Sequence, residues 1–146
     1  MLEIFQFIAV LSGTLFTGAA IYINLVEHPA RMGCGTELAI TEWAPSYNRA
    51  TGMQVPLAIG STIAGAGSWF ITGNLLWLLG TLLIFAVIPF TFIAIMPTNK
   101  LLLDPGIDKT SPTTRALPEK WGTLHGVRSI LSLVASALFL IQVLRS

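Results

Sequence analysis

The residues with the greatest capacity for chemistry stand where apolar runs of the sequence begin or end. Glu27 and His28 are adjacent in the stretch "LVEHPAR", and His125 and Arg128 lie close together in "LHGVR". Both histidines of the chain belong to these two groups. A carboxylate, imidazoles and a guanidinium together supply the groups needed for proton transfer, for binding an anion or for ligating a metal.

These polar residues are predicted to share one end of a helical bundle. Residues spaced i, i+4, i+7 and i+11 form a stripe on one helix face, and such a stripe consists of Trp121, His125, Arg128 and Ser132. Ionisable residues in a membrane span usually face the protein interior or a wet cavity, although an arginine near a helix end can also extend to the interface. We predict one polar site at one mouth of the bundle, drawn from Glu27, His28, Arg31, Trp43, Tyr47, Arg49, Asn99, His125 and Arg128.

The elements that position these residues are predicted to be membrane helices. The 146 residues are 53% hydrophobic and only 10% charged, whereas soluble domains carry about 25% charged residues. A membrane helix needs roughly 20 mainly apolar residues. The first run has Glu3 and no basic residue ahead of it, unlike a signal peptide. The sequence therefore predicts a single all-α domain over 1–146, an integral membrane four-helix bundle of two helical hairpins with spans at about 4–26, 53–70, 75–96 and 121–144.

The links between the spans predict the topology. The 71–74 link is short, whereas 27–52 and 97–120 are long, polar and predicted to be loops on the same side of the membrane. Most basic residues fall in these long links, so the positive-inside rule places the links in the cytoplasm and the termini on the opposite side. We expect the endoplasmic reticulum membrane if the chain is eukaryotic. A net charge of +1 without a basic cluster argues against a nucleic-acid partner.

Three short motifs carry a resemblance to a known family. "VEHPAR" after the first span, "MPTNKLLL" after the third and "W..LH..R" at the opening of the fourth resemble the DUF1772 membrane family, which includes the fungal anthrone oxygenases. The resemblance covers nearly the whole chain. It implies oxidation of a polycyclic anthrone to an anthraquinone by molecular oxygen. The positions that match the family pattern are Glu27, His28, Pro29, Asn99, Trp121, His125 and Arg128.

The chemistry implied by this resemblance gives each polar residue an expected role. An anthrone has an acidic methylene, and His125 or His28 is the expected base, with Glu27 orienting or charging a partner. Arg128 and Asn99 are expected to stabilise the enolate oxygen. The expected substrate-binding residues are Trp43, Tyr47, Trp121 and Arg49. O2 is the co-substrate, and no metal or flavin is required. The expected partners are a hydrophobic small molecule and membrane lipid, and the oligomeric state is left open.

Two alternatives stand beside the oxygenase interpretation. Glu27, His28 and His125 have the composition of a two-histidine, one-carboxylate metal site, although adjacent helical residues point about 100° apart. Alternatively, the bundle is a structural, lipid-binding or assembly protein whose charges pair for stability, for example Glu27 with Arg128. The sequence contains no phosphate loop and no GxSxG nucleophile elbow, which argues against nucleotide hydrolases and serine esterases of that type.

Overall fold

The chain folds into four long helical columns. The computed structural model describes residues 1–145, and no strand occurs among them. A π-helical segment interrupts the first column and another interrupts the third. In chain order the elements are α1 (Leu2–Tyr22), η1 (Ile23–Glu27), α2 (His28–Gly33), α3 (Thr36–Thr72), α4 (Leu75–Phe90), η2 (Thr91–Ile95), α5 (Met96–Leu102), η3 (Pro112–Arg115) and α6 (Ala116–Arg145).

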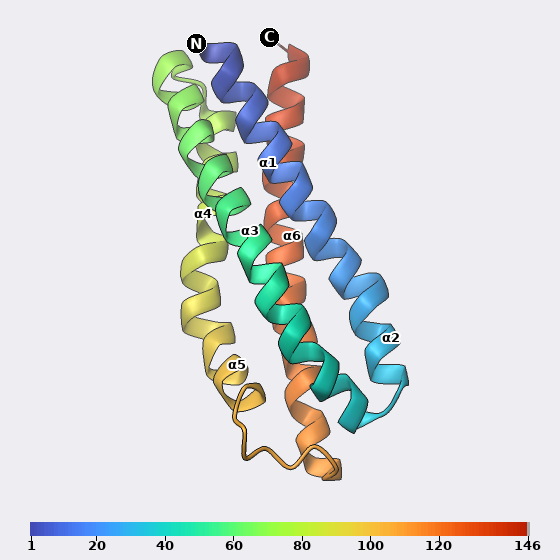
Figure 1. Ribbon diagram of the computed structural model, residues 1–146. Coiled ribbons are helices and arrows are strands. Elements are labelled where there is room, and N and C mark those ends of the chain that lie inside the picture. The colour runs from blue at the N-terminus through green and yellow to red at the C-terminus, as the bar shows by residue number, and fades with distance from the viewer. Residues whose placement is uncertain (146) are drawn as a thin grey trace.

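Columns that follow one another in the chain run antiparallel. Both termini and the link between α3 and α4 lie at one end of the bundle, and the α2–α3 turn and the loop after α5 lie at the other (Figure 1). α1 packs against α3 and α6, and α4 packs against the same two helices. This arrangement confirms the predicted all-α bundle of two helical hairpins.

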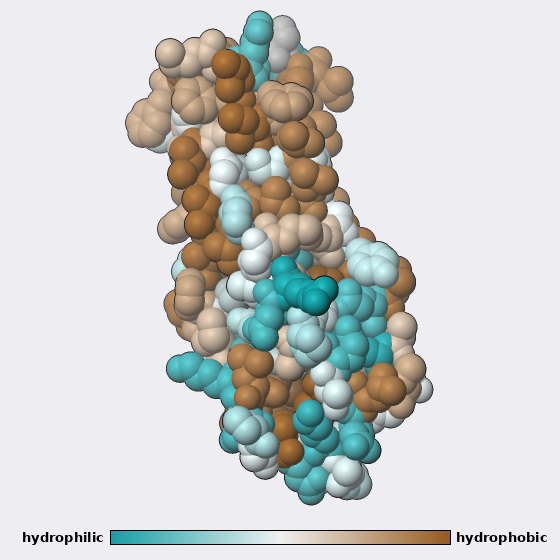
Figure 2. All heavy atoms as spheres, in the orientation of Figure 1, coloured by the Kyte–Doolittle hydropathy of each residue, from teal (hydrophilic) through white to brown (hydrophobic). Residues whose placement is uncertain are grey.

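Each column is long and apolar enough to cross a membrane. The stretches concerned are Leu2–Gly33, Thr36–Thr72, Leu75–Leu102 and Pro112–Arg145. In Figure 2, hydrophobic residues cover the half of the visible face nearer the termini, and hydrophilic residues gather on the other half. At ~1.5 Å per residue α3 is about 55 Å long, which exceeds the roughly 30 Å apolar core of a bilayer. The bundle therefore fits a multi-pass membrane protein whose polar end extends out of the apolar layer.

The prediction of a loop over 27–52 was wrong. Residues 28–33 form α2 and residues 36–52 form the first part of α3, with only a tight turn at Cys34 and Gly35 between them. Gly35 adopts φ +95°, a conformation that favours glycine. In α3, Glu37, Thr41 and Asn48 are exposed, whereas Ile40 and Trp43 are buried. Hydropathy averaged along the chain cannot separate such an amphipathic helix from a polar loop.

The other links agree better with the sequence. The α3–α4 link is short, as predicted: Gly73 adopts a left-handed conformation, and the side chain of Asn74 accepts a hydrogen bond from the backbone N–H of Leu76. The 97–120 link is a loop only over residues 103–111, because α5 continues to Leu102 and η3 begins at Pro112. In this loop the Asp108 carboxylate accepts hydrogen bonds from Thr110, which lowers the pKa of that carboxyl.

Prolines explain the two π-helical segments. Pro29 and Pro97 have no backbone N–H to donate to the carbonyl four residues earlier, and a proline ring crowds that carbonyl. In each case the residue before the proline donates its N–H five residues back: His28 to Ile23, and Met96 to Thr91. The two hairpins therefore share a structural feature, a π turn that widens the first helix of each hairpin.

Aromatic packing fixes the half of the bundle nearer the termini. Phe139 of α6 and Trp77 of α4 are fully buried, with ring centroids 5.1 Å apart. Gly80 leaves space for this pair, because a Cβ at that position would lie 2.5 Å from Cε1 of Phe139. A hydroxyl adds a polar link between columns, since Ser61 Oγ donates to the carbonyl of Ala9 over 2.9 Å.

The variant Gly80→Ala is expected to destabilise the bundle by roughly 1–3 kcal/mol, because the added methyl group overpacks a filled core. Thermal unfolding in detergent measures the effect. Gly18→Ala on α1 is the matched control, since no atom lies within 4 Å of a Cβ built there. Equal stability of the two variants would contradict the close packing at Gly80.

Cysteine labelling in sealed vesicles tests the topology. Cys34 is exposed in the α2–α3 turn, and in a Cys34→Ser background the variants Pro105→Cys and Ile71→Cys report the two opposite ends. An impermeant reagent should modify the chain at 34 and 105 from the same side and at 71 from the other. Labelling at 34 and 105 from opposite sides would contradict this fold.

Candidate functional site

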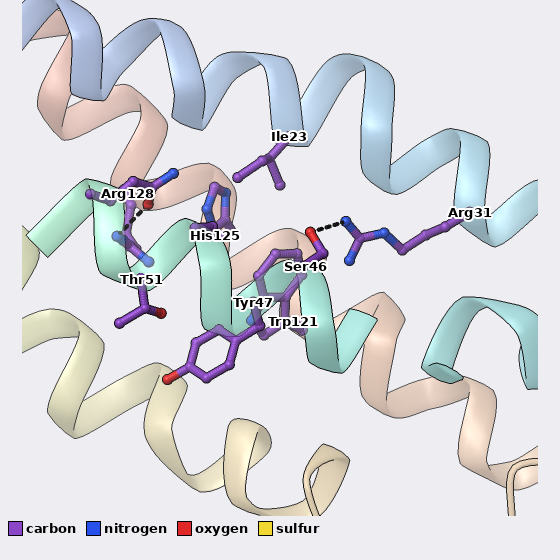
Figure 3. A pocket seen from close by; sticks show the side chains of 10 residues that line it. Ile23, Arg31, Ser46, Tyr47, Thr51, Trp121, His125 and Arg128 are labelled. Atoms are coloured by element: carbon purple, nitrogen blue, oxygen red, sulfur yellow. Dashed lines mark hydrogen bonds between the residues drawn. The ribbon is translucent and has the colours of Figure 1, made fainter. Parts of the chain in front are cut away.

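Two neighbouring cavities lie in the polar half of the bundle. The smaller one, which we call the chamber, has a volume of about 20 Å³ and is lined by Arg31, Ser46, Tyr47, Trp121, His125 and Arg128, among others (Figure 3). The larger one, which we call the apolar pocket, has a volume of about 280 Å³, and its walls include Phe16, Val55, Ala58, Ile59, Val87 and Phe92. The two cavities share Tyr47, Thr51, Gln54 and Arg128. A polar chamber and a largely apolar pocket therefore meet at one wall.

His125 is held in a defined orientation by Asn24. The histidine is 1% exposed, and its Nδ1 lies 2.7 Å from Oδ1 of Asn24. The amide orientation is fixed because Nδ2 of Asn24 donates to the carbonyl of Gly122 over 3.0 Å, while Oδ1 also accepts from Ser129 Oγ over 2.6 Å. An amide oxygen only accepts, so Nδ1 of His125 must be the donor. The neutral ring therefore carries its lone pair on Nε2, as a base requires.

Arg128 has no acidic partner. Its Nη2 donates to Oε1 of Gln54 over 3.0 Å, and its guanidinium carbon lies 5.5 Å from the ring centroid of Phe16. The Nε atom is buried without a hydrogen-bond partner, and among residues 1–145 no carboxylate lies within ion-pair distance of this side chain. A guanidinium stays protonated, and an unpaired charge in an apolar bundle is costly. The wall shared by the two cavities is therefore suited to a negatively charged ligand atom.

Arg31 is the second guanidinium of the chamber, and its charge is neutralised. It is 4% exposed and forms ion pairs with Glu27 and, over 2.7 Å, with Glu42. Ser46 donates to Glu27 and accepts from Nη2 of Arg31 over 3.2 Å. The guanidinium also lies 6.0 Å from the ring centroid of Trp121. Glu27 thus pairs with Arg31, and the pairing with Arg128 considered from the sequence does not occur.

Trp121 packs against both histidines. Its ring centroid lies 4.8 Å from that of His125 and 5.2 Å from that of His28. His28 is buried but lines a different, surface-facing pocket with Asn24 and Arg115. His28 therefore does not line the chamber with His125 and Arg128.

The remaining predicted residues lie at different distances from the chamber. Tyr47 lines both cavities, and Trp43 is fully buried behind it with the two rings stacked at 4.9 Å. Asn99 is 0% exposed, and its side chain lines neither cavity. Arg49 is exposed and lines an outer groove between α1 and α3. The structure thus gathers Tyr47, Trp121, His125 and Arg128 around the chamber and leaves Asn99 and Arg49 outside it.

Comparison with known sequences shows the family of the chain. The sequence model described as Anthrone oxygenase matches residues 43–138. The chain belongs to the anthrone oxygenase family. The match includes the chamber residues Tyr47, Trp121, His125 and Arg128, and it begins after Glu27 and His28.

Curated relatives align with the chain over most of its length. It is 26% identical to the anthrone oxygenase tpcL of Aspergillus fumigatus, over 96% of this chain and 93% of that protein. It is 26% identical to an anthrone oxygenase of Claviceps purpurea, over 88% of this chain and 82% of the relative. It is 27% identical to the anthrone oxygenase AgnL2 of Paecilomyces divaricatus, over 91% of each chain. No solved structure matches the chain.

The geometry does not assemble the metal site considered from the sequence. Within residues 1–145, no group of three or more histidine, cysteine, aspartate or glutamate side chains is placed to hold a metal ion. Glu27 is bound to Arg31 and Ser46, and His28 and His125 line different cavities. The ligand set of Glu27 and both histidines therefore does not converge in this member of the anthrone oxygenase family.

Several residues of the site received no role in the sequence analysis. Asn24 orients His125, Gln54 binds Arg128, and Ser46 joins Glu27 to Arg31. Asn24 and Gln54 could have been noticed in the sequence, because a buried amide within an apolar helix is costly unless it is hydrogen-bonded. Such residues mark contacts to other helices, but only the fold reveals which side chain each one meets.

Nitrogen-15 NMR of the imidazole tests the orientation of His125. In the neutral ring, Nε2 should give the signal of an unprotonated nitrogen and Nδ1 that of a protonated one. Asn24→Leu removes the acceptor and should mix the tautomers, whereas Asn24→Asp keeps an acceptor and should preserve the pattern. A proton on Nε2 in the unsubstituted protein would contradict the hydrogen bond to Asn24.

Proposed function

We propose that this protein oxidises a hydrophobic polycyclic aromatic of the anthrone type to the corresponding quinone with molecular oxygen. The observation that carries the proposal is the unneutralised guanidinium of Arg128, which stands between an apolar pocket and a chamber containing His125. A ligand that is apolar over most of its surface and becomes anionic at one oxygen matches both features. The curated relatives named anthrone oxygenase support the same reaction class.

The proposed reaction begins with proton transfer. The aromatic rings occupy the apolar pocket with the methylene carbon at the opening to the chamber, within reach of Nε2 of His125. Loss of a methylene proton produces an enolate, whose oxygen accepts hydrogen bonds from Arg128. A fixed cation in a site of low polarity stabilises such a charge more strongly than water does. The enolate is electron-rich enough to reduce oxygen directly, so the proposed route uses neither metal nor flavin.

The position of the pocket supports access from the lipid. Its outer wall includes Val55, Ile59 and Phe92, whose exposed fractions are 47%, 44% and 64%. These residues belong to α3 and to the η2 segment that follows α4. We propose that the substrate enters between these two columns from the bilayer. We also propose that the polar end faces the cytoplasm, from an endoplasmic reticulum membrane if the organism is eukaryotic.

Substitution of His125 and Arg128 tests the mechanism. His125→Gln should lower turnover by about 10²–10⁴-fold, because a positioned base contributes that much. Arg128→Lys should lower it by about 10²-fold, because an ammonium does not reproduce the guanidinium geometry. His28→Gln should lose less than His125→Gln, since His28 lies outside the chamber. Oxygen uptake and quinone absorbance with purified protein and an anthrone measure these rates.

Arg115→Lys is the matched control for the arginine substitution, since Arg115 pairs with Glu119 away from both cavities. Thermal unfolding confirms that each variant is folded. Undiminished turnover in His125→Gln would remove this residue from the mechanism, and sensitivity to a chelator would indicate a metal. If the unsubstituted protein fails to exceed the spontaneous rate across several anthrones, the oxygenase proposal is wrong and a binding or assembly role takes its place.

A further inference from the structure

We propose that the chamber beside His125 is the site at which molecular oxygen binds and at which the hydroperoxide formed from it is held. This inference rests on the proposed function, because it assigns the second substrate of that reaction to a cavity of its own. It identifies the chamber, which is separate from the apolar pocket, as the place where oxygen meets the enolate.

The volumes of the two cavities indicate which of the two substrates each cavity can hold. A cavity needs roughly 10–15 Å³ of this kind of volume to hold one water molecule, so the chamber, at about 20 Å³, accepts a diatomic molecule but no aromatic ring. The apolar pocket, at about 280 Å³, approaches the size of typical small-molecule sites. A polycyclic substrate therefore fits only in the apolar pocket, which leaves the chamber for a small partner.

The distribution of lining residues places the reacting carbon between the cavities. His125 lines the chamber but not the apolar pocket, whereas Arg128 lines both. A base in the chamber reaches a methylene in the pocket only if that carbon lies at the shared wall. The carbon that loses its proton to Nε2 is then adjacent to whatever occupies the chamber. Oxygen held there is positioned to react with the same carbon.

The charges around the chamber suit a peroxide better than neutral oxygen alone. Arg31 offers no free positive charge to the chamber, because Glu27 and Glu42 both pair with it. Arg128 has no carboxylate partner, and its Nε lacks a hydrogen-bond acceptor in the described part of the chain. A negative charge that develops on oxygen inside the chamber is therefore stabilised by a guanidinium already in place.

The reaction balances with the groups present. His125 takes one methylene proton, and the enolate transfers electrons to oxygen as a carbon–oxygen bond forms. The resulting peroxide anion recovers that proton from His125 and becomes a hydroperoxide. His125 then removes the second hydrogen of the same carbon, the O–O bond breaks, and a carbonyl forms. Hydroxide leaves and takes the proton, so one methylene and one O2 give one carbonyl and one water.

Filling the chamber tests this assignment. Ala50 lines the chamber and the outer groove but not the apolar pocket, so Ala50→Leu occupies the chamber without removing a polar group. The control is Met53→Leu, because Met53 lines only the outer groove among these three cavities. Initial rates are measured over a range of oxygen concentrations, and binding of an anthraquinone is measured separately by fluorescence.

In Ala50→Leu, kcat/KM for oxygen should fall about tenfold or more, because a misplaced reactant loses at least that much. Anthraquinone affinity should remain near that of the unsubstituted protein, and Met53→Leu should be normal in both measurements. An unchanged kcat/KM for oxygen in folded Ala50→Leu, or a loss confined to anthraquinone affinity, would overturn the chamber assignment alone. Ala50→Val, a smaller filling, replaces the leucine variant if that variant does not fold. Absence of oxidation by the unsubstituted protein would instead refute the proposed function.

Discussion

The positive charge of Arg128 must be held inside an apolar bundle that offers it no carboxylate. α3 supplies an amide oxygen from Gln54 and α1 an aromatic face from Phe16, which are weaker partners than an ion pair. Retaining a charge under these conditions is costly. Two cavities open beside the guanidinium, and Arg128 lines both of them.

The rest of the polar end keeps this site open and ordered. Arg31 satisfies Glu27 and Glu42 together and packs over Trp121, so the α1–α2 column is fastened to α3 and α6. Asn24 fixes the orientation of His125 through two hydrogen bonds of its side-chain amide. Oδ1 accepts from Nδ1 of His125, and Nδ2 donates to the carbonyl of Gly122. Arg31 is therefore paired and His125 hydrogen-bonded, whereas no carboxylate among residues 1–145 lies within ion-pair distance of Arg128.

The two halves of the bundle differ in packing: the half near the termini is tightly packed, and the other half contains the candidate site. Near the termini, Phe139 and Trp77 fill the interior, and Gly80 lets α4 and α6 approach closely. In the other half, π turns before Pro29 and Pro97 widen the first helix of each hairpin. Rigid packing near the termini therefore supports a polar half whose interior is less completely filled. The two cavities of the candidate site lie in this polar half.

The sequence by itself determined the four apolar helices, their order and the end at which polar residues gather, because these depend on local composition and length. It also carried the family resemblance through short motifs around His28, Asn99 and His125. Only the tertiary structure decided that residues 28–33 and 36–52 are helical, that Trp121 packs against both histidines, and that Asn24 orients His125. Those features depend on the rotation of each helix about its axis and on contacts between residues about a hundred positions apart, such as Asn24 with His125. The pattern of residues along the sequence contains neither the rotation of a helix nor the identity of such distant contacts.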